Sequence, residues 1–308
     1  MLNQVQFVYD AAVVAAIGRR ELQEDAIASR FPAKSELAYV VLADGMGGHS
    51  DGDLASQIVV QEFLDEMELH ADDPANLERN ISLVLRHSID RANRAVASEI
   101  STNPDRTGMG TTFVAPVFLR NRLYWVSVGD SPLYLMRGNR LSRLNQEHSF
   151  AKRLDRLVSD GLISKRDADL DPDRQCLTSA LSGGFVAEID LPDRPLELLD
   201  GDVVIVASDG LLFIDESQVA RLVFENRDRP STEISARLIR EIQENDDPQQ
   251  DNVSLCVIKV SQPAPAEKLQ PPAPIRPRKI TPKRTTVQLQ VQRKDNRVIR
   301  KFSLQSED

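Results

Sequence analysis

Five short acidic segments, spread along the chain, constrain its fold more than any other feature. Four of them place an aspartate next to a glycine or an asparagine, at one end of an apolar run that indicates a buried strand. Charged residues are seldom buried unless they are paired or bound to a metal. The pattern therefore predicts strand ends that converge on divalent cations. The segments are ELQEDA (21–26), VLADGMGGH (41–49), VSVGDS (126–131), VIVASDGLL (204–212) and QDNVSL (250–255).

Charge divides the chain into an acidic body and a basic tail. Residues 263–308 hold 11 Lys and Arg against 4 Asp and Glu, so they carry +7, while residues 1–262 carry −16 and the whole chain −9. An acidic body argues against nucleic acid as the main ligand and fits cation binding. The basic tail could meet acidic protein, anionic lipid or nucleic acid, but a solvated tail without a ligand is the favoured interpretation.

Cysteine usage and hydropathy indicate a cytoplasmic protein without a membrane span. Cys176 and Cys256 form no CxxC motif, which favours small buried side chains in a reducing compartment. No apolar run approaches the roughly 18 residues that cross a bilayer. Residues 5–17 are rich in Ala and Val, but no basic residue precedes them and Asp10 interrupts them, so they predict a first strand rather than a secretion signal.

Apolar periodicity predicts an α+β fold, because strands and helices come in groups rather than in alternation. The segment 145–175 is polar and weakly periodic, which indicates a helical, mobile insertion beside the sheet. The β-rich runs at 111–118, 123–128 and 133–137 are separated by tight turns and predict an antiparallel meander. Further strands are expected at 5–15, 25–31, 37–43, 203–207 and 253–260, and helices at 52–68, 74–100, 216–224 and 231–244.

Composition predicts three parts along the chain. Residues 1–260 form the globular domain, and residues 261–282, with 7 of the 17 prolines, form an extended linker. In the tail, residues 283–308, Val287, Leu289 and Val291 alternate with Gln, which suggests a small hairpin. Such a hairpin is marginal in water, so it is either disordered or docked on a partner, and disorder is expected for the tail alone.

Each acidic position has a plain structural alternative. Asp44 could cap the helix that follows it, and this alternative is as probable as a metal role when Asp44 is considered alone. Asp130, Asp209 and Asp251, each taken alone, are more often turn residues than ligands. Their joint occurrence at strand ends reverses that preference.

Seven short motifs in order resemble the PPM family of metal-dependent protein phosphatases, the protein phosphatase 2C-like enzymes, in its bacterial type. The similarity covers about residues 5–260 and implies a four-layer αββα fold, a central sandwich of two antiparallel β-sheets flanked by helices. One short motif is weak evidence, but seven in order make chance agreement improbable. They are Arg20 four residues before EDA (24–26), DGMGGH (44–49), GTT (110–112), GDS (129–131), LTSALSG (177–183), ASDGL (207–211) and DN (251–252).

The resemblance implies a site for two Mn²⁺ or Mg²⁺ ions. Asp44 would bridge the ions, and the Gly45 carbonyl would bind one of them. Asp209 and Asp251 would complete the ligand set of the other ion. Glu24 matches a ligand of the ion on the Gly45 side.

The same resemblance implies supporting roles around the ions. Asp25 would hold metal-bound waters from outside the ligand set, and Asp130 matches the position of a third, weaker metal. Arg20 matches the phosphate-binding arginine, although the adjacent Arg19 leaves open which of the two reaches the phosphate. The insertion at 145–175 corresponds to the flap of the family, where a substrate role and a solvated helical pair are equally open.

The function expected from the resemblance is a phosphoprotein phosphatase. It would hydrolyse phosphoserine and phosphothreonine on proteins by attack of a metal-activated water, opposing a bacterial Ser/Thr kinase. A monomer is expected, with no nucleic-acid partner. The alternative is a catalytically weak regulatory module of the same fold, with the tail as a docking element. Asp44, Asp209 and Asp251 argue against it, because degenerate copies typically lose such carboxylates.

Overall fold

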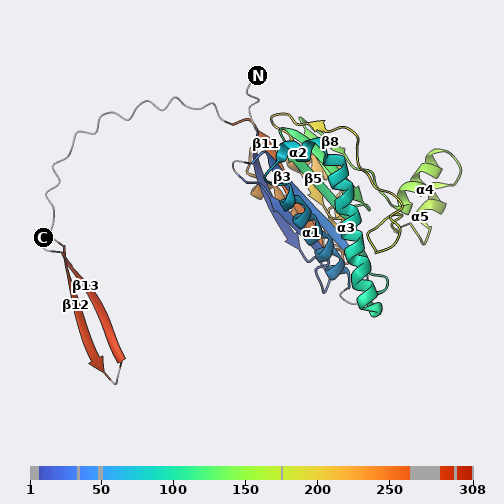
Figure 1. Cartoon of the computed structure of the whole chain (residues 1–308). Coiled ribbons are helices and arrows are strands. Elements are labelled where there is room, and N and C mark those ends of the chain that lie inside the picture. The colour runs from blue at the N-terminus through green and yellow to red at the C-terminus, as the bar shows by residue number, and fades with distance from the viewer. Residues whose placement is uncertain are drawn as a thin grey trace. The chain divides into compact units, whose positions relative to one another are not determined.

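The computed structural model describes residues 7–32, 35–47, 51–174, 176–263, 285–294 and 297–306. The chain forms two compact units, Met1–Pro263 and Ala264–Asp308, which are described separately. In the first unit, two antiparallel sheets stack face to face between layers of helices (Figure 1). The α+β sandwich expected from the sequence is therefore confirmed.

Both sheets of the first unit are built from strands that are distant in the sequence. The first sheet has the order β2 (Asp25–Arg30), β3 (Leu37–Met46), β5 (Phe113–Leu119), β6 (Arg122–Val128) and β9 (Leu196–Glu197), with β4 (Gly110–Thr111) pairing with the end of β3. The second has the order β1 (Val8–Ala16), β11 (Val253–Ser261), β10 (Val203–Ala207), β7 (Leu133–Arg137) and β8 (Arg140–Arg143).

Strand β3 shows why the molecule has four layers. Tyr39 and Val41 point into a cluster of buried side chains that also holds Phe63 of α1 (Asp51–Leu69). Val40 and Leu42 point the other way, into a cluster shared with the second sheet. Because neighbouring residues of a strand face opposite sides, a strand buried on both faces is apolar throughout.

Helices cover the outer face of each sheet. Helix α1 packs beside α3 (Ile81–Thr102) over the first sheet (Figure 1). Helices α6 (Glu216–Glu225) and α7 (Ser231–Glu244) share a third buried cluster with the second sheet. Three apolar layers thus separate four layers of secondary structure.

The predicted helical insertion contains two short helices, α4 (Phe150–Ser159) and α5 (Lys165–Asp169), at the side of the sandwich (Figure 1). Helix α4 begins after Ser149, whose Oγ accepts a hydrogen bond from the Lys152 N–H at 3.2 Å. This serine cap satisfies one of the free amides of the first turn.

The single helix predicted over 74–100 is wrong. The structure has two helices, α2 (Pro74–Arg79) and α3, and the break falls at Asn80. The Asn80 Nδ2 donates to the Asn76 carbonyl at 3.0 Å, and the Asn80 N–H donates to the Asn76 and Leu77 carbonyls. Asparagine competes with helix propagation in this way because its amide binds nearby backbone groups.

The antiparallel meander predicted over 111–137 is also wrong beyond its first hairpin. Strands β5 and β6 pair with each other, but β7 belongs to the second sheet and pairs with β8 and β10. The chain crosses between sheets at Gly129, whose φ of +100° suits glycine. A Cβ there would lie 2.8 Å from the Thr112 side chain, so a larger residue could not make this crossing.

The second unit contains one pair of antiparallel strands among its described residues. In the second unit, β12 (Thr285–Lys294) pairs with β13 (Arg297–Ser306), with Thr285 opposite Ser306. They are the two arms of the expected hairpin, whose turn lies outside the described residues, and the division into domain, linker and tail stays a prediction. Within the described ranges, no helix combines the length and the apolar character that a bilayer crossing requires.

Candidate metal and phosphate site

Asp44 lies near the end of β3, and its backbone is fixed on both sides. Its N–H donates to Thr112 Oγ1 at 2.9 Å, and its carbonyl accepts from the Thr112 N–H at 2.9 Å and from Thr111 Oγ1 at 2.8 Å. Asp25 of β2 lies directly opposite in the strand register. Asp44 sits within a strand and not at a helix start, so the alternative of a helix cap is wrong.

Gly45 allows the first turn of α1 to approach the end of β3. A Cβ at this position would lie 2.1 Å from the Gly52 carbonyl oxygen, which leaves no room for a larger residue. The Gly45 N–H donates to the Glu24 carbonyl at 3.1 Å. The glycine therefore joins β3, α1 and the segment before β2 at one point.

Asp209 and Asp251 come from neighbouring strands of the second sheet. Asp209 begins the short 3₁₀ helix η2 (Asp209–Phe213) just after β10, and Asp251 precedes β11. Ser208, next to Asp209, donates through its Oγ to Asp25 Oδ2 at 2.8 Å. This bond ties the second sheet to the first directly beneath the predicted ligands.

The loop that carries Arg20 and Glu24 is organised by Asn252. The Asn252 Oδ1 accepts from the Glu24 N–H at 2.7 Å, and its Nδ2 donates to the carbonyls of Ile17 at 2.8 Å and Leu22 at 2.9 Å. Asn252 belongs to the DN motif, but no role was predicted for it. The only sequence signal for this role was its place directly after Asp251. A buried amide that satisfies three backbone groups fixes the conformation of a loop firmly.

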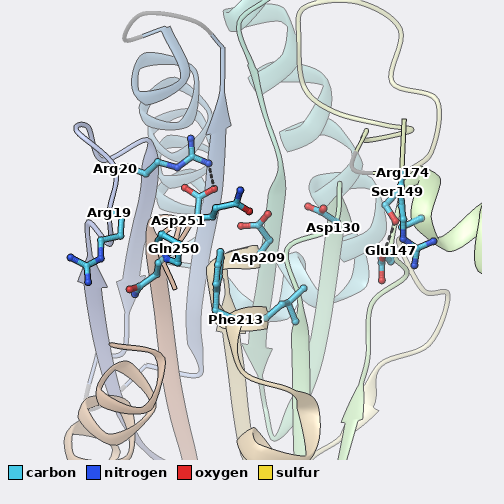
Figure 2. A pocket seen from close by; sticks show the side chains of 14 residues that line it. Arg19, Arg20, Asp130, Glu147, Ser149, Arg174, Asp209, Phe213, Gln250 and Asp251 are labelled. Atoms are coloured by element: carbon cyan, nitrogen blue, oxygen red, sulfur yellow. Dashed lines mark hydrogen bonds and ion pairs between the residues drawn. The ribbon is translucent and has the colours of Figure 1, made fainter. Parts of the chain in front are cut away.

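Asp130 lies on the crossing between the sheets. Its carbonyl accepts a hydrogen bond from Arg143 Nη2 at 2.5 Å. Figure 2 shows Asp251, Asp209 and Asp130 in a row across the site, each with its carboxylate in the same cleft. Three segments remote in sequence are thereby brought together.

The predicted residues share an inner cavity of about 270 Å³. Asp25 does not line this cavity, although it pairs in register with Asp44 and accepts the Ser208 hydrogen bond. Its predicted supporting role stays a prediction. The last residues of the DGMGGH motif, 48–49, lie outside the described part of the chain. The cavity is lined by Arg20, Glu24, Asp44, Gly45, Asp130, Asp209 and Asp251, together with Met46, Gly47, Thr112, Leu177 and Asn252.

The inner cavity adjoins a wider cleft of about 820 Å³ that contains Arg20, Asp130, Asp209 and Asp251 as well. The insertion contributes Ser149, Ala151 and Arg174 to this outer cleft, and η2 contributes Leu212 and Phe213.

The two adjacent arginines occupy different positions. Arg20 lines both cavities, and its Nη2 lies 2.5 Å from Asp251 Oδ2. Arg19 lines the outer cleft and forms an ion pair with Asp246. In Figure 2 the Arg19 side chain points away from the row of aspartates. The geometry therefore favours Arg20 for a phosphate held in the inner cavity.

Burial and mutual repulsion raise the pKa values of the carboxyl groups. Burial, with the Asp209 charge as a smaller cause, raises the pKa of Asp130 to about 7. Burial also raises the pKa of Asp25 to about 7, despite its hydrogen bond from Ser208. The pKa values of Asp44 and Asp209 are raised by burial and by neighbouring aspartates. Such a cluster holds more negative charge than one arginine can offset.

The donor set fits hydrated hard cations. In the part of the chain described here, no three His, Cys, Asp or Glu side chains surround one point closely enough to hold an ion by themselves. Mg²⁺ usually keeps several waters and binds through one or two carboxylates, so a fully enclosing set is not required. Oxygen ligands with unsatisfied negative charge suit Mg²⁺ or Mn²⁺.

Comparison with known proteins identifies relatives of one kind. A sequence model described as protein phosphatase 2C matches residues 15–250. The serine/threonine protein phosphatase PstP of Mycobacterium tuberculosis is 36% identical over 172 residues, which are 56% of this chain and 31% of that protein. The serine/threonine phosphatase stp of Listeria welshimeri is 34% identical over 182 residues, which are 59% of this chain and 69% of the relative. The chain thus matches about a third of the length of the mycobacterial protein.

Solved structures agree with the fold. The crystal structure of the M. tuberculosis phosphatase PstP/Ppp is 29% identical, has a TM-score of 0.69 and aligns over 82% of this chain and 99% of its own. A structure of the PstP catalytic domain in complex with two manganese ions is 28% identical, with a TM-score of 0.64 and coverage of 83% and 99%.

Proposed function

The chain belongs to the protein phosphatase 2C family, and from this membership and the site geometry we propose that it is a metal-dependent protein serine/threonine phosphatase. The proposed reaction is hydrolysis of phosphoserine and phosphothreonine on proteins. The observation that carries the proposal is the inner cavity, which gathers Asp44, Asp209 and Asp251 from both sheets and sets Arg20 beside them. A dianionic phosphate would be repelled by these carboxylates alone, so the proposal includes cations.

We propose two Mn²⁺ or Mg²⁺ ions as cofactors. Asp44, the Gly45 carbonyl, Asp209 and Asp251 would hold them, with Glu24 as a further ligand and Asp130 at a third, weaker position. Two bound ions of this kind neutralise phosphate charge and lower the pKa of a water for in-line attack. The two manganese ions in the related PstP catalytic domain support this assignment.

The protein's own groups would position the phosphate and its peptide. The Arg20 guanidinium offers planar, paired donors that match two phosphate oxygens. The backbone contacts of Asp44 with Thr111 and Thr112 fix its position before substrate arrives. The outer cleft opens directly onto the row of aspartates, which supports it as the place of the peptide around the phosphoresidue.

The decisive experiment is release of phosphate from a phosphothreonine peptide in Mn²⁺, for the wild type and for Asp209→Asn. We expect a loss of at least about 100-fold in kcat for the variant, the scale found when one group that stabilises transition-state charge is removed. Asp215→Asn is the matched control. Asp215 caps α6 outside both cavities, and Asn is an equally good cap, so its activity should match the wild type.

Two results would overturn the proposal: full activity of Asp209→Asn, or no metal-dependent turnover by the wild type. Phosphopeptide binding without turnover would favour the alternative of a regulatory module. Comparison of the full chain with a chain ending at residue 262 would test the tail as a docking element. An opposing Ser/Thr kinase, the monomeric state and the cytoplasmic location stay predictions.

A further inference from the structure

Residues of the segment 143–148 form hydrogen bonds with successive residues of the loop that carries Asp130. Arg143 Nη2 donates to the Asp130 carbonyl at 2.5 Å. The His148 N–H donates to the Gly129 carbonyl at 2.9 Å, and the Gly129 N–H donates back to His148 Nδ1 at 3.1 Å. This segment leads into α4, the first helix of the insertion that lines the outer cleft.

Asn145 is the centre of this arrangement. Its Oδ1 accepts from the Leu133 N–H at 2.8 Å, and its Nδ2 donates to the Ser131 carbonyl at 2.9 Å and to Ser127 Oγ at 3.2 Å. Since the Leu133 N–H can only donate, these bonds fix the orientation of the amide. The side chain is buried, with 6% of the residue exposed, so no water replaces these contacts readily.

A short chain of hydrogen bonds continues from this loop to Asp44. Ser131 Oγ lies 2.7 Å from Thr112 Oγ1, and Thr112 Oγ1 accepts the Asp44 N–H at 2.9 Å. Both Ser131 and Thr112 are buried. A displacement of the Ser131 backbone would therefore reach Asp130 through the covalent chain and Asp44 through two side-chain contacts.

We propose that Asn145 is a positioning residue that sets both Asp130 and Asp44 for cation binding. The inference rests on the proposed function, because it assigns those aspartates to the ions. Substitution of Asn145 is a cleaner test of this role than substitution of Arg143, because Arg143 carries a charge and also pairs with Glu147 at 2.7 Å. Replacement of a neutral amide leaves the net charge of the site unchanged, and the contact of Arg143 with the Asp130 carbonyl is not removed directly. The long contact from Arg143 Nε to Asn145 Oδ1, at 3.4 Å, is lost with the amide.

The experiment compares Asn145→Ala with Asn226→Ala. Asn226 is also a buried asparagine, and its Nδ2 donates to the Leu222 carbonyl at 2.7 Å, in the layer of helices on the second sheet. We expect both variants to lose thermal stability. Only Asn145→Ala should weaken Mn²⁺ binding in calorimetry, by roughly tenfold, as partners behind metal ligands typically do. Its kcat should fall at saturating peptide while KM for the peptide stays within about twofold, since none of the Asn145 contacts involves Arg20, the proposed phosphate contact.

Mn²⁺ affinity and kcat of Asn145→Ala equal to those of the wild type would overturn the inference and leave the proposed phosphatase intact. An equal loss in Asn226→Ala would overturn it too, because the effect would then be general destabilisation. If Asn145→Ala does not fold, Ser131→Ala decides, since it removes the link to Thr112 and keeps the Asn145 contacts. A loss of Mn²⁺ affinity in Ser131→Ala that is smaller than the roughly tenfold loss expected for Asn145→Ala supports the inference. An affinity equal to that of the wild type contradicts it. Failure of the phosphatase proposal would show separately, as a wild type without metal-dependent turnover.

Discussion

At the scale of single residues, Arg20 pairs with Asp251, a carboxylate that is also a proposed cation ligand. The Arg20 guanidinium lies 2.5 Å from Asp251 Oδ2, and Asp251 Oδ1 accepts the Asn252 N–H at 2.7 Å. The same arginine is the proposed phosphate contact. Its positive charge would therefore oppose the cation and favour the substrate.

Replacement of Arg20 by Gln should separate these two effects. We expect Mn²⁺ to bind about fivefold more tightly, because a partly exposed charge contact of this kind is worth about 1 kcal/mol. KM for a phosphothreonine peptide should rise at least about tenfold, since hydrogen bonds to charged groups contribute about 1.5–3 kcal/mol. Calorimetry and steady-state kinetics measure the two quantities. Arg19→Gln is the control for Mn²⁺ affinity, which it should leave unchanged, and weaker Mn²⁺ binding by Arg20→Gln would contradict the account.

The raised carboxyl pKa values predict how stability depends on pH. An aspartate in the unfolded chain titrates near pH 3.9, whereas burial raises the pKa of Asp25 and Asp130 to about 7 in the fold. Between these values the unfolded chain releases protons that the fold retains, so stability falls as pH rises through this window. In a chelator, Tm should therefore fall from pH 5 to pH 8.

Cations should reverse this trend, because they replace the protons on the same carboxylates. A Mn²⁺ concentration 100 times the dissociation constant at pH 8 should add about 2.7 kcal/mol there. The same concentration should add less at pH 5, where protons occupy the carboxylates. Scanning fluorimetry across the pH series measures both effects. Asp130→Asn should flatten the slope in chelator, and a Tm that rises from pH 5 to pH 8 without metal would contradict the prediction.

At the scale of elements, apolar periodicity predicted most strands and helices because burial leaves a direct trace in sequence. Strand β3 is the clearest case, since both of its faces are buried and its apolar run ends at the predicted ligand Asp44. The two errors have different causes. The meander predicted over 111–137 breaks where the chain crosses between sheets at Gly129. Asn80 splits the helix predicted over 74–100 through its bond to Asn76.

In the candidate site, too, short sequence motifs predicted some residues, while the role of others depends on contacts with residues distant in sequence. Acidic residues next to glycine or asparagine predicted the ligand positions, and the structure gathers Asp44, Asp130, Asp209 and Asp251 around one cavity. Asn145 left no comparable signal, and Asn252 was visible only as the neighbour of Asp251, without its own contacts. Each binds backbone groups far away in sequence, such as Asn252 with Ile17 and Leu22. Only the folded arrangement of the sheets identifies these partners.

At the scale of the whole molecule, the sandwich explains why proposed ligands so far apart in sequence lie at one site. Asp25, at the start of β2, pairs with Asp44, near the end of the neighbouring strand β3, while Asp209 and Asp251 flank neighbouring strands of the second sheet. The bond from Ser208 to Asp25 joins the sheets at this edge. The packing of the two sheets therefore builds the site, and cations bound there should stabilise the fold as a whole.

The most direct test of the central claim is phosphate release by the wild type from a phosphothreonine peptide, before chelation, after removal of metal, and after Mn²⁺ is returned. The account predicts a fall to the uncatalysed background on chelation and recovery on addition of Mn²⁺, with a rise in Tm at the same step. Turnover that persists in excess chelator would contradict the claim that this carboxylate site works through bound cations.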